Sequence, residues 1–435
     1  MRRIFPVAAS LIALPSVGQG LASGPALTTG QTSDHHSVYA GALNPALGDL
    51  MVNDGEQFRL GFTPSLSTLT EIGQVDNFVD DLDDLIDLID DPSLNKDPVQ
   101  TVLDRFNSIL VKMGDEGYVK NSAELHLPLM PLYWKMPLWD GTLMADISFN
   151  TQVLARVLDA PLSYDEQNKS FSTATAAYLK GATQTAFALG YSRGWFDGAD
   201  QKRYGGQLYA GAKLSVYALD LSKQVFLLQK LDGKDIGDVI RDEYDNNSQS
   251  TTAPGLDVGV IWAADRYRLG ATLYNLNQPS FDYGPVGENC QTRAENSIAR
   301  ANCEAAADFA QVRGDIKARE THKKTAYLGL DGTYYWQSNA WASAALDLTA
   351  YDDFVGTEQQ WLTISAHYAP STHWLPNVRS GLQKNLAGSQ LTQLALGIEF
   401  KGVSLDVSWA LDSTRVDGSD LPRSFGFALA IAEQF

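Results

Sequence analysis

The chain has 435 residues, of which 44% are hydrophobic and only 20% are charged, and its formal net charge is −19. So acidic a chain is a poor partner for nucleic acid, which is bound by basic surfaces. Beyond the N-terminus, no uninterrupted apolar stretch reaches the roughly 18 residues of a transmembrane helix, which excludes a polytopic helical membrane protein. Two cysteines are too few for a disulfide scaffold or a zinc ribbon. A large soluble β-rich protein or a membrane β-barrel remains.

The N-terminus has the pattern of a secretory signal peptide over residues 1–22. Two arginines precede an apolar stretch from Ile4 to Leu14, and small residues lead to a cleavage site near Ala22. The apolar stretch is too short to span a bilayer, so an N-terminal anchor is disfavoured. Cleavage would remove two arginines and no acids, changing the formal net charge from −19 to −21. We expect an exported and strongly acidic mature protein.

Residues 23–56 are polar and rich in glycine, serine and threonine, and we expect an irregular lead-in there. Between residues 72 and 113, apolar residues recur at steps of three and four, which predicts amphipathic helices. Seven aspartates between Asp80 and Asp91 separate the apolar positions. They lack the glycine and the terminal glutamate of a calcium loop, so we assign them to a solvated helix face. A second helical insertion is predicted over 218–244, packed over or inside the sheet, with docking on a partner as the alternative.

From about Glu124 onward, short segments alternate between apolar and polar residues, which predicts strands with one wet face. In the segment 403–409, one face carries Val, Leu, Val and Trp and the other carries Ser, Asp and Ser. We count 12 to 16 such segments, and a closed bacterial barrel needs an even number. Further examples are 143–149, 171–179, 183–191, 205–216, 255–262, 266–275, 326–336, 342–350, 362–368, 375–383 and 393–400.

Three features favour a membrane barrel over a soluble periplasmic sheet. The apolar faces are uniform, and the opposite faces carry charged residues such as Asp257 and Asp406, as suits a polar lumen. Tyrosine and tryptophan gather at strand ends, for example at 334–336, Trp341 and Trp374, as at a membrane interface. The chain ends in a strand closed by Phe435, which resembles the signal read by the outer-membrane barrel-insertion machinery. Glu433 departs from that signal, because an apolar residue is usual there.

Three motifs that could carry chemistry have simpler interpretations. Gly190-Tyr-Ser-Arg-Gly194 matches a nucleophile elbow, but its surroundings favour a turn between strands over a hydrolase site. Cys290 and Cys303 are expected to form a disulfide that closes a polar loop and stabilises it by about 2–4 kcal/mol. His35 and His36 lie in the lead-in and are interpreted as incidental. We therefore expect no enzyme activity, no metal and no cofactor.

The signal peptide, the Asn44-Pro45-Ala46 motif, the acidic helical insertion and the long series of strands together resemble the conjugal transfer TraF-like outer-membrane proteins. That family looks related to FadL-type fatty acid transporters and to barrels of the same fold that serve secretion. The resemblance implies a plug in the lumen, with Asn44, Pro45 and Ala46 in a rigid turn. FadL-type transport depends on a hydrophobic groove and a kinked strand. Glycine-bearing strands such as 205–211 could supply the kink or reflect close backbone packing.

We therefore predict an all-β membrane barrel of about 14 antiparallel strands over residues 57–435, preceded by a plug-like segment over 23–56. The expected location is the outer membrane of a Gram-negative bacterium, in contact with lipid. The first hypothesis is an accessory component of a conjugal transfer or secretion apparatus, with envelope proteins as partners. The alternative is a FadL-type passive transporter of fatty acids or other hydrophobic compounds. A soluble periplasmic scaffold is the third hypothesis.

Overall fold

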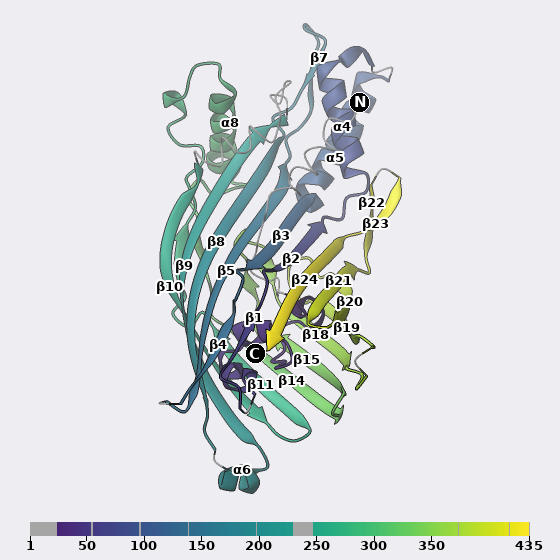
Figure 1. Cartoon of the computed structure of the whole chain (residues 1–435). Coiled ribbons are helices and arrows are strands. Elements are labelled where there is room, and N and C mark those ends of the chain that lie inside the picture. Colours follow the sequence, from purple (N-terminus) through teal and green to yellow (C-terminus); the bar gives the residue numbers. More distant parts are fainter. Residues whose placement is uncertain are drawn as a thin grey trace.

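The computed structural model describes residues 24–53, 55–94, 97–137, 139–196, 198–228, 247–372, 374–416 and 418–434. Within these residues, 14 antiparallel strands close into a barrel (Figure 1). In order around the ring they are β5 (Gly141–Leu158), β3 (Tyr118–His126), β2 (Ser65–Ile72), β24 (Ser424–Gln434), β21 (Val403–Ala410), β20 (Thr392–Phe400), β19 (Asn377–Asn385), β18 (Trp361–Tyr368), β15 (Ala340–Asp347), β14 (Tyr327–Gln337), β11 (Tyr267–Tyr274), β10 (Gln249–Ala263), β9 (Gln207–Leu227) and β8 (Ala176–Gly194). Strand β8 pairs with β5 and closes the ring, which confirms the predicted fold class.

The outer and inner faces of the wall differ in polarity as the alternation predicts. Leu394, Leu396 and Ile398 of β20 are exposed on the outside, whereas Gln393 is buried on the inside. Asp257 and Asp406 are also buried, on other strands of the wall. An apolar exterior and a closed hydrogen-bonded ring are what a sheet needs in hydrocarbon, where an unpaired backbone group costs several kcal/mol. Among the described residues, no helix combines the length and the apolar character needed to cross a membrane.

The wall is interrupted at one place, where two short strands continue the ring below β2 and β3. Strand β1 (Phe58–Gly61) pairs with β24 and with β4 (Leu132–Met136), and β4 pairs with β5. The intervening residues 127–131 form an apolar bulge. Its backbone is largely satisfied, because the N–H of Leu127 donates to Ile147 at 3.2 Å and the N–H of Met130 donates to Leu127 at 3.2 Å. Two of the five positions are prolines, which have no N–H to satisfy.

Strand length differs sharply around the ring. Strands β5, β8 and β9 have 18, 19 and 21 residues, whereas β18, β20 and β21 have 8 or 9. A tilted strand needs only about 9–11 residues to span a bilayer, so the long strands extend well beyond it. The segments predicted separately at 171–179 and 183–191 are therefore wrong as two strands, since residues 176–194 form β8 alone. The short strands agree with the predicted spacing.

The helix predicted over 218–244 is wrong for its described part, because residues up to Leu227 belong to strand β9. Tyr217, Leu219 and Leu221 are buried on the inner face of the upper wall, so apolar residues lie on the side where a polar lumen was assumed. The helix was predicted because Leu221, Val225 and Leu228 recur at steps of four and three, which imitates a helical repeat. The remainder of that prediction, residues 229–246, lies outside the described residues.

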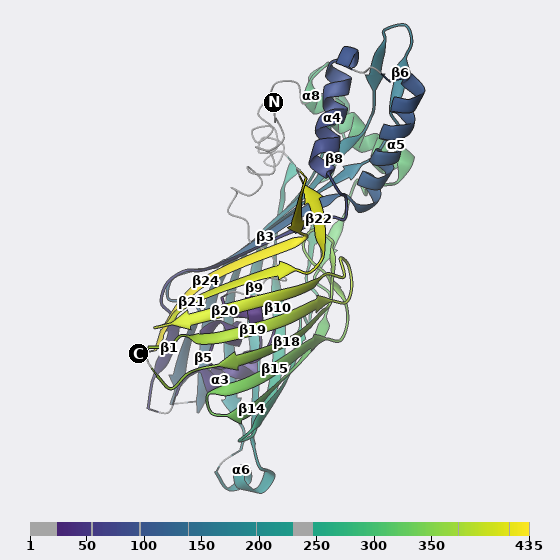
Figure 2. The same ribbon diagram turned by 90° about the vertical axis from the view of Figure 1, so that its right-hand side faces the viewer.

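A head of helices and short hairpins lies at one end of the barrel (Figures 1 and 2). Helices α4 (Phe78–Asp90) and α5 (Val99–Glu116) occupy the segment where the sequence predicts helices, joined through η3 (Pro92–Leu94). The other elements of the head are α8 (Ile298–Ala307), η5 (Cys290–Thr292), the π-helix η6 (Asp308–Arg313), and the hairpins β6–β7 (Ser163–Asp165, Ser170–Ser172), β12–β13 (Ser280–Asp282, Thr321–Lys323), β16–β17 (Tyr351–Asp352, Glu358–Gln359) and β22–β23 (Ser413–Val416, Ser419–Pro422).

The head packs its apolar residues inward. Leu85 of α4 and Phe106 of α5 share one core with Phe171 of β7. Phe309 shares a second core with Tyr178 and Val225 of the long strands. The long strands therefore serve as the support of the head, because their upper parts are covered by it.

The opposite end of the barrel has short turns and one small helix, α6 (Gly198–Tyr204). Exposed aromatic residues gather near these turns, as at a membrane interface; they include Trp139, Trp195, Tyr267, Tyr334, Trp336, Tyr368 and Trp374. Trp341 departs from the expected belt, because it is buried and stacks on His36 inside the barrel. A histidine partner in the lumen explains why this tryptophan faces inward.

Candidate functional site inside the barrel

Residues 24–53 fold inside the barrel as a plug. Four short helical elements form it: α2 (Ala26–Thr29), η1 (Val38–Ala42), η2 (Pro45–Leu47) and α3 (Gly48–Met51). Asn44 precedes η2, and its side-chain oxygen accepts a hydrogen bond from the Ala46 N–H at 3.0 Å, while Pro45 occupies the first helical position. Asparagine before proline is a favourable start for such a turn. Ala46 and Leu47 are fully buried, so the motif lies in the centre of the molecule.

Glycines in the wall allow the plug backbone to approach closely. A Cβ atom on Gly211 of β9 would lie 2.3 Å from the Pro45 carbonyl oxygen, and one on Gly259 of β10 would lie 2.1 Å from Asn44 Oδ1. No side chain fits at such distances without displacing the plug. Close backbone packing, rather than a strand kink, therefore accounts for Gly211 in the glycine-bearing segment 205–211.

Polar contacts fasten the plug to the wall on several sides. The donors come mostly from wall strands and the acceptors are mostly plug carbonyls: Arg59 to His35 at 2.6 Å, Tyr133 to Val38 at 2.9 Å, Lys213 to Ala42 at 2.6 Å, Arg268 to Ser33 at 2.8 Å and Gln383 to Leu27 at 2.7 Å. Thr28 donates to Asp406 at 2.5 Å, and Ser33 Oγ donates to Asp331 at 2.8 Å. Withdrawing the plug would leave buried charges without partners, which is costly.

A cavity of about 190 Å³ lies between the plug and the head. Charged and amide groups line much of it, including the Lys213–Asp257 pair at 3.1 Å and the His126–Asp146 pair at 2.9 Å. Lys324, in the loop before β14, donates to Gln184 at 3.3 Å, and burial lowers its pKa to about 7. Ligand pockets for hydrophobic compounds are mostly apolar and larger, about 300–1,000 Å³. This cavity resembles a small polar chamber.

Ion pairs lie at the base of the head, above the polar chamber. Lys120 is 3.0 Å from Asp353, and Lys180 is 2.7 Å from Glu320. Burial raises the pKa of Glu320, but Lys180 and Lys223 outweigh it, so the pKa falls below its usual value. Lys180 and Lys223 also lie over the ring of Tyr283. These groups join strands β3, β8 and β9 to the loops of the head.

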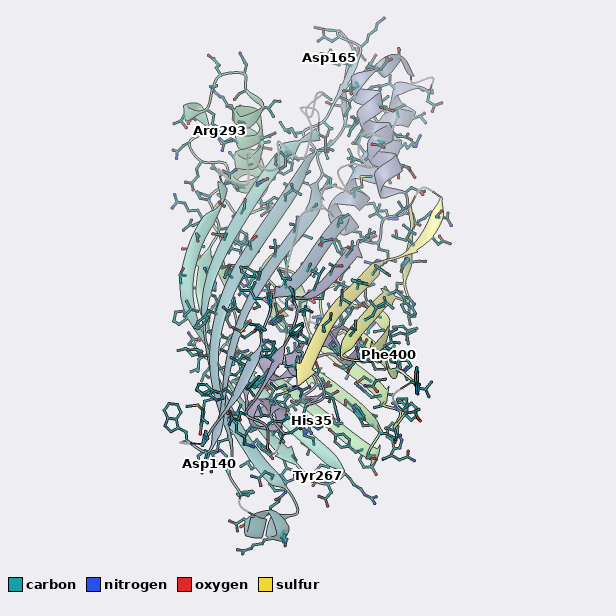
Figure 3. The ribbon with its side chains drawn as sticks, viewed as in Figure 1. His35, Asp140, Asp165, Tyr267, Arg293 and Phe400 are labelled. Carbon is teal, nitrogen blue, oxygen red and sulfur yellow. A yellow bond between two sulfur atoms is a disulfide. The ribbon has the colours of Figure 1, made fainter. Side chains whose placement is uncertain are left out.

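A second cavity of about 540 Å³ lies on the side of the plug that faces the short turns. The plug contributes Asp34, His35 and His36 to its lining, and the wall contributes His367 and Arg379. Figure 3 shows His35 in this lower part of the barrel. Burial raises the pKa of Asp34, but the three histidines around it outweigh this effect and hold the pKa well below its usual range.

The structure places the predicted motifs in different parts of the molecule. Cys290 of η5 and Cys303 of α8 are joined by a disulfide in the head, with an S–S distance of 1.97 Å. Phe435 and the signal peptide over 1–22 lie outside the described residues. The predicted turn at 190–194 is wrong, because these residues are the end of strand β8. Ser192 is buried there beside the plug, not presented on an elbow.

The sequence did not indicate that His367 approaches Asp34, the carboxylate beside the histidine pair. The Nδ1 atom of His36 is 2.8 Å from Asp34, and that of His367 is 3.8 Å from the other oxygen of the same carboxylate. His367 follows Thr363 and Ser365 on the polar face of β18, which signals a position inside the barrel but not its partner. The acidic run on α4 remains a solvated face, with Asp84, Asp87 and Asp90 exposed.

Comparison with known proteins gives one family and a group of distant barrels. The family model described as "F plasmid transfer operon, TraF, protein" matches residues 41–348. Similar solved structures include the Pseudomonas putida toluene transporter TodX, with 12% identity, coverage of 96% of this chain and 99% of that chain, and a TM-score of 0.45. The Ralstonia pickettii toluene transporter TbuX has 12% identity, coverage of 95% and 98%, and a TM-score of 0.42. A Pseudomonas aeruginosa FadL homologue has 13% identity, coverage of 97% and 99%, and a TM-score of 0.38. The comparison with curated proteins gave no match.

Proposed function

The chain belongs to the family described as F plasmid transfer operon, TraF, protein, and from this premise we propose that it is a non-enzymatic accessory component of a conjugal transfer or secretion apparatus. Its proposed location is the outer membrane of a Gram-negative bacterium. The observation that carries the proposal is the head, an ordered structure with one core of its own and a second core shared with the extended strands on which it stands.

The outward face of helix α4 is acidic and not apolar. Leu82, Leu85 and Leu88 of α4 are buried, while Asp84, Asp87 and Asp90 are exposed. An apolar groove for a partner helix is therefore not the basis of the proposal. We propose that the acidic face of α4 binds a basic surface on the partner, since complementary charge steers association and selects partners.

The head faces away from the cell in this proposal. Bacterial outer-membrane barrels have short periplasmic turns and long extracellular loops. Here the short turns include residues 264–266, 338–339 and 401–402, all at the end opposite the head. Strand β24 also runs from the head toward that end. The partner is therefore a cell-surface part of the transfer apparatus or the envelope of the recipient cell.

The test measures transfer from a donor strain that lacks this gene and is complemented with variants. The first variant replaces residues 74–116 by a short turn, and the second carries Asp84→Asn, Asp87→Asn and Asp90→Asn. We expect both to reduce transfer frequency while retaining the heat-modifiable migration of an intact barrel. The matched control neutralises Asp200 and Asp265 at the opposite end and should transfer normally. Normal transfer by the variant without residues 74–116 would contradict the proposal.

A second candidate function is passive transport of hydrophobic compounds through the wall. The observation that favours it is the bulge at residues 127–131, which exposes Leu129 between the end of β3 and the start of β4. The chamber inside at this level contains His126 and Asp146, which suit water better than hydrocarbon. Mass spectrometry of protein purified in detergent separates the two functions. A co-purified apolar compound favours transport, and its absence from protein that supports transfer favours the accessory function.

A further inference from the structure

The polar chamber between the plug and the head contains one carboxylate without a cationic partner. Three of the four acids that line it are paired: Asp257 lies 3.1 Å from Lys213, and Asp146 and Glu124 lie 2.9 and 3.1 Å from His126. Asp347, at the end of β15, is 2% exposed. One of its oxygens accepts a hydrogen bond from the Trp361 backbone N–H at 3.0 Å, and no other donor or cation meets this carboxylate among the described residues. A buried charge left in this way is costly and calls for a partner.

A second acceptor faces the same place as the free oxygen of Asp347. A Cβ atom built on Gly329 of β14 would lie 3.8 Å from Asp347 Oδ1, 3.8 Å from Gln31 Oε1 and 3.1 Å from Cε2 of Tyr274. The Gln31 oxygen is buried and has no hydrogen-bond partner in the described part of the chain. Two oxygen acceptors, one from the wall and one from the plug, therefore face one point above a glycine without a donor.

From this arrangement we infer that the polar chamber binds a small primary amine, whose ammonium group lies against Asp347 and Gln31. An ammonium group supplies what the two oxygens lack, because it carries three N–H donors, one positive charge and no acceptor. Its hydrogen bond to a carboxylate is charge-assisted and therefore strong. The chamber of about 190 Å³ is smaller than the 300–1,000 Å³ typical of drug-sized ligands, which limits the amine to a short carbon chain.

Aromatic rings beside the carboxylate suit the carbon chain of such a ligand. Tyr327 stacks on Tyr274 with ring centroids 4.5 Å apart and on Tyr351 with centroids 4.2 Å apart. All three rings line the chamber, together with Leu346 and Trp361. Because stacking already holds the rings in place, binding requires little rearrangement of the site. Apolar walls with a few convergent polar groups are typical of sites for small molecules.

The cations that line the chamber do not take the place of the ammonium group. Lys213 and His126 are held by the paired acids. Lys324 lies 3.5 Å from the centre of the Tyr217 ring on β9 and donates to Gln184 on β8 at 3.3 Å. In the order of the ring, β14, β11 and β10 separate these two strands from β15, which carries Asp347. With every group ionised, four carboxylates face three cations, so one further positive charge balances the chamber.

The test measures binding of radiolabelled butylamine to the full-length protein in detergent by equilibrium dialysis. The wild type should hold about one amine per chain. Asp347→Asn should weaken binding roughly tenfold or more, as expected for loss of a charge-assisted hydrogen bond. The matched control Asp331→Asn makes the same change on the inner face of β14, outside the chamber lining, and should bind as the wild type does. Heat-modifiable migration checks that both variants fold. A wild type without bound amine, or an Asp347→Asn variant that binds it as tightly, would overturn the inference.

A second measurement compares ligands and does not depend on the folding of variants. Butan-1-ol has a carbon chain of the same length as butylamine but no charge, and Na⁺ has the charge but no carbon chain. Unlabelled butylamine should displace the labelled amine from the wild type, whereas the same concentration of butan-1-ol or Na⁺ should leave it bound. Equal displacement by the alcohol would show that the ammonium group is not recognised, and equal displacement by Na⁺ would show a plain cation site. Either result would overturn the inference.

A third variant tests the position of the ammonium group. Gly329→Ala keeps every charge of the chamber and places a methyl group at the point that the oxygens of Asp347 and Gln31 face. It should weaken binding of butylamine while the barrel keeps its heat-modifiable migration. Unchanged binding by this variant would overturn the position assigned to the ammonium group.

Discussion

The barrel wall has short strands on one side of the ring and long strands on the opposite side. On the side of β18, β20 and β21, strands of 8 or 9 residues match the thickness of a bilayer, and apolar residues face outward at every second position. On the side of β5, β8 and β9, strands of 18 to 21 residues extend past the bilayer, and their upper parts are covered by the head. The same sheet thus serves as membrane wall on one side and as both wall and support on the other.

The largest expected effect concerns the head above the long strands. Phe106 of α5 is 5% exposed in the core shared with Leu85 and Phe171. Phe106→Ala should destabilise this core by about 3–5 kcal/mol, because a large cavity replaces the ring. Limited proteolysis should then cleave within residues 78–116 while the barrel keeps its heat-modifiable migration. Loss of both together would show that the head and the barrel are a single cooperative unit.

The next effect concerns the short strands. Leu396 on β20 is 50% exposed on the outer face, and Leu396→Arg should cost about 2–4 kcal/mol near the bilayer midplane. The amount of folded protein in the membrane fraction should fall. Val312→Arg in the head, at a position 78% exposed, is the matched control and should leave insertion unchanged. Equal insertion of both variants would contradict the assignment of β20 to the lipid-facing wall.

A smaller and more local effect is expected for the disulfide of the head. Cys290→Ala opens the loop beside α8 and should cost about 2–4 kcal/mol of loop stability. The mobility difference between reduced and unreduced protein should disappear on a gel, and Cys303→Ala should behave in the same way. A difference that persists in the Cys290→Ala variant would contradict the disulfide.

The smallest effect is a pH dependence at Lys324, where the loops of the head meet the barrel. Burial lowers its pKa to about 7, whereas an unfolded lysine titrates near 10.5. Between these values the unfolded chain holds more protons, so stability rises with pH. The wild type should gain on the order of a few degrees in unfolding temperature from pH 7 to 10 relative to Lys324→Met. If the unfolding temperatures of the two proteins change equally with pH, Lys324 is not the group that causes the pH dependence.

Sequence reasoning predicted the short-stranded side well and the long-stranded side poorly. Residues 403–409 alternate because one face meets lipid and the other meets polar groups in the lumen, such as Thr28 of the plug, and this alternation is visible in the sequence. In the upper part of β9, Ser222, Lys223 and Val225 are all buried, since the strand has protein on both sides. Alternation is lost there, and the apolar spacing imitates a helix.

The plug was predictable as a segment but not as a site. Asn44 and Pro45 indicate a rigid turn from local chemistry alone. That Asp34 meets His367 depends on how the plug is oriented in the lumen, and this follows from contacts such as Arg59 to His35 that join distant parts of the chain. Local pattern carries no information about such pairs.

The central claim, that the head projects from the outer face of the cell, is tested most directly by cysteine labelling in intact cells. Glu166→Cys places a thiol in the β6–β7 hairpin of the head, and Lys202→Cys places one on α6 at the opposite end. A membrane-impermeant maleimide should label Glu166→Cys in intact cells and Lys202→Cys only after the outer membrane is permeabilised. Labelling in the reverse order would place the head in the periplasm and contradict the account.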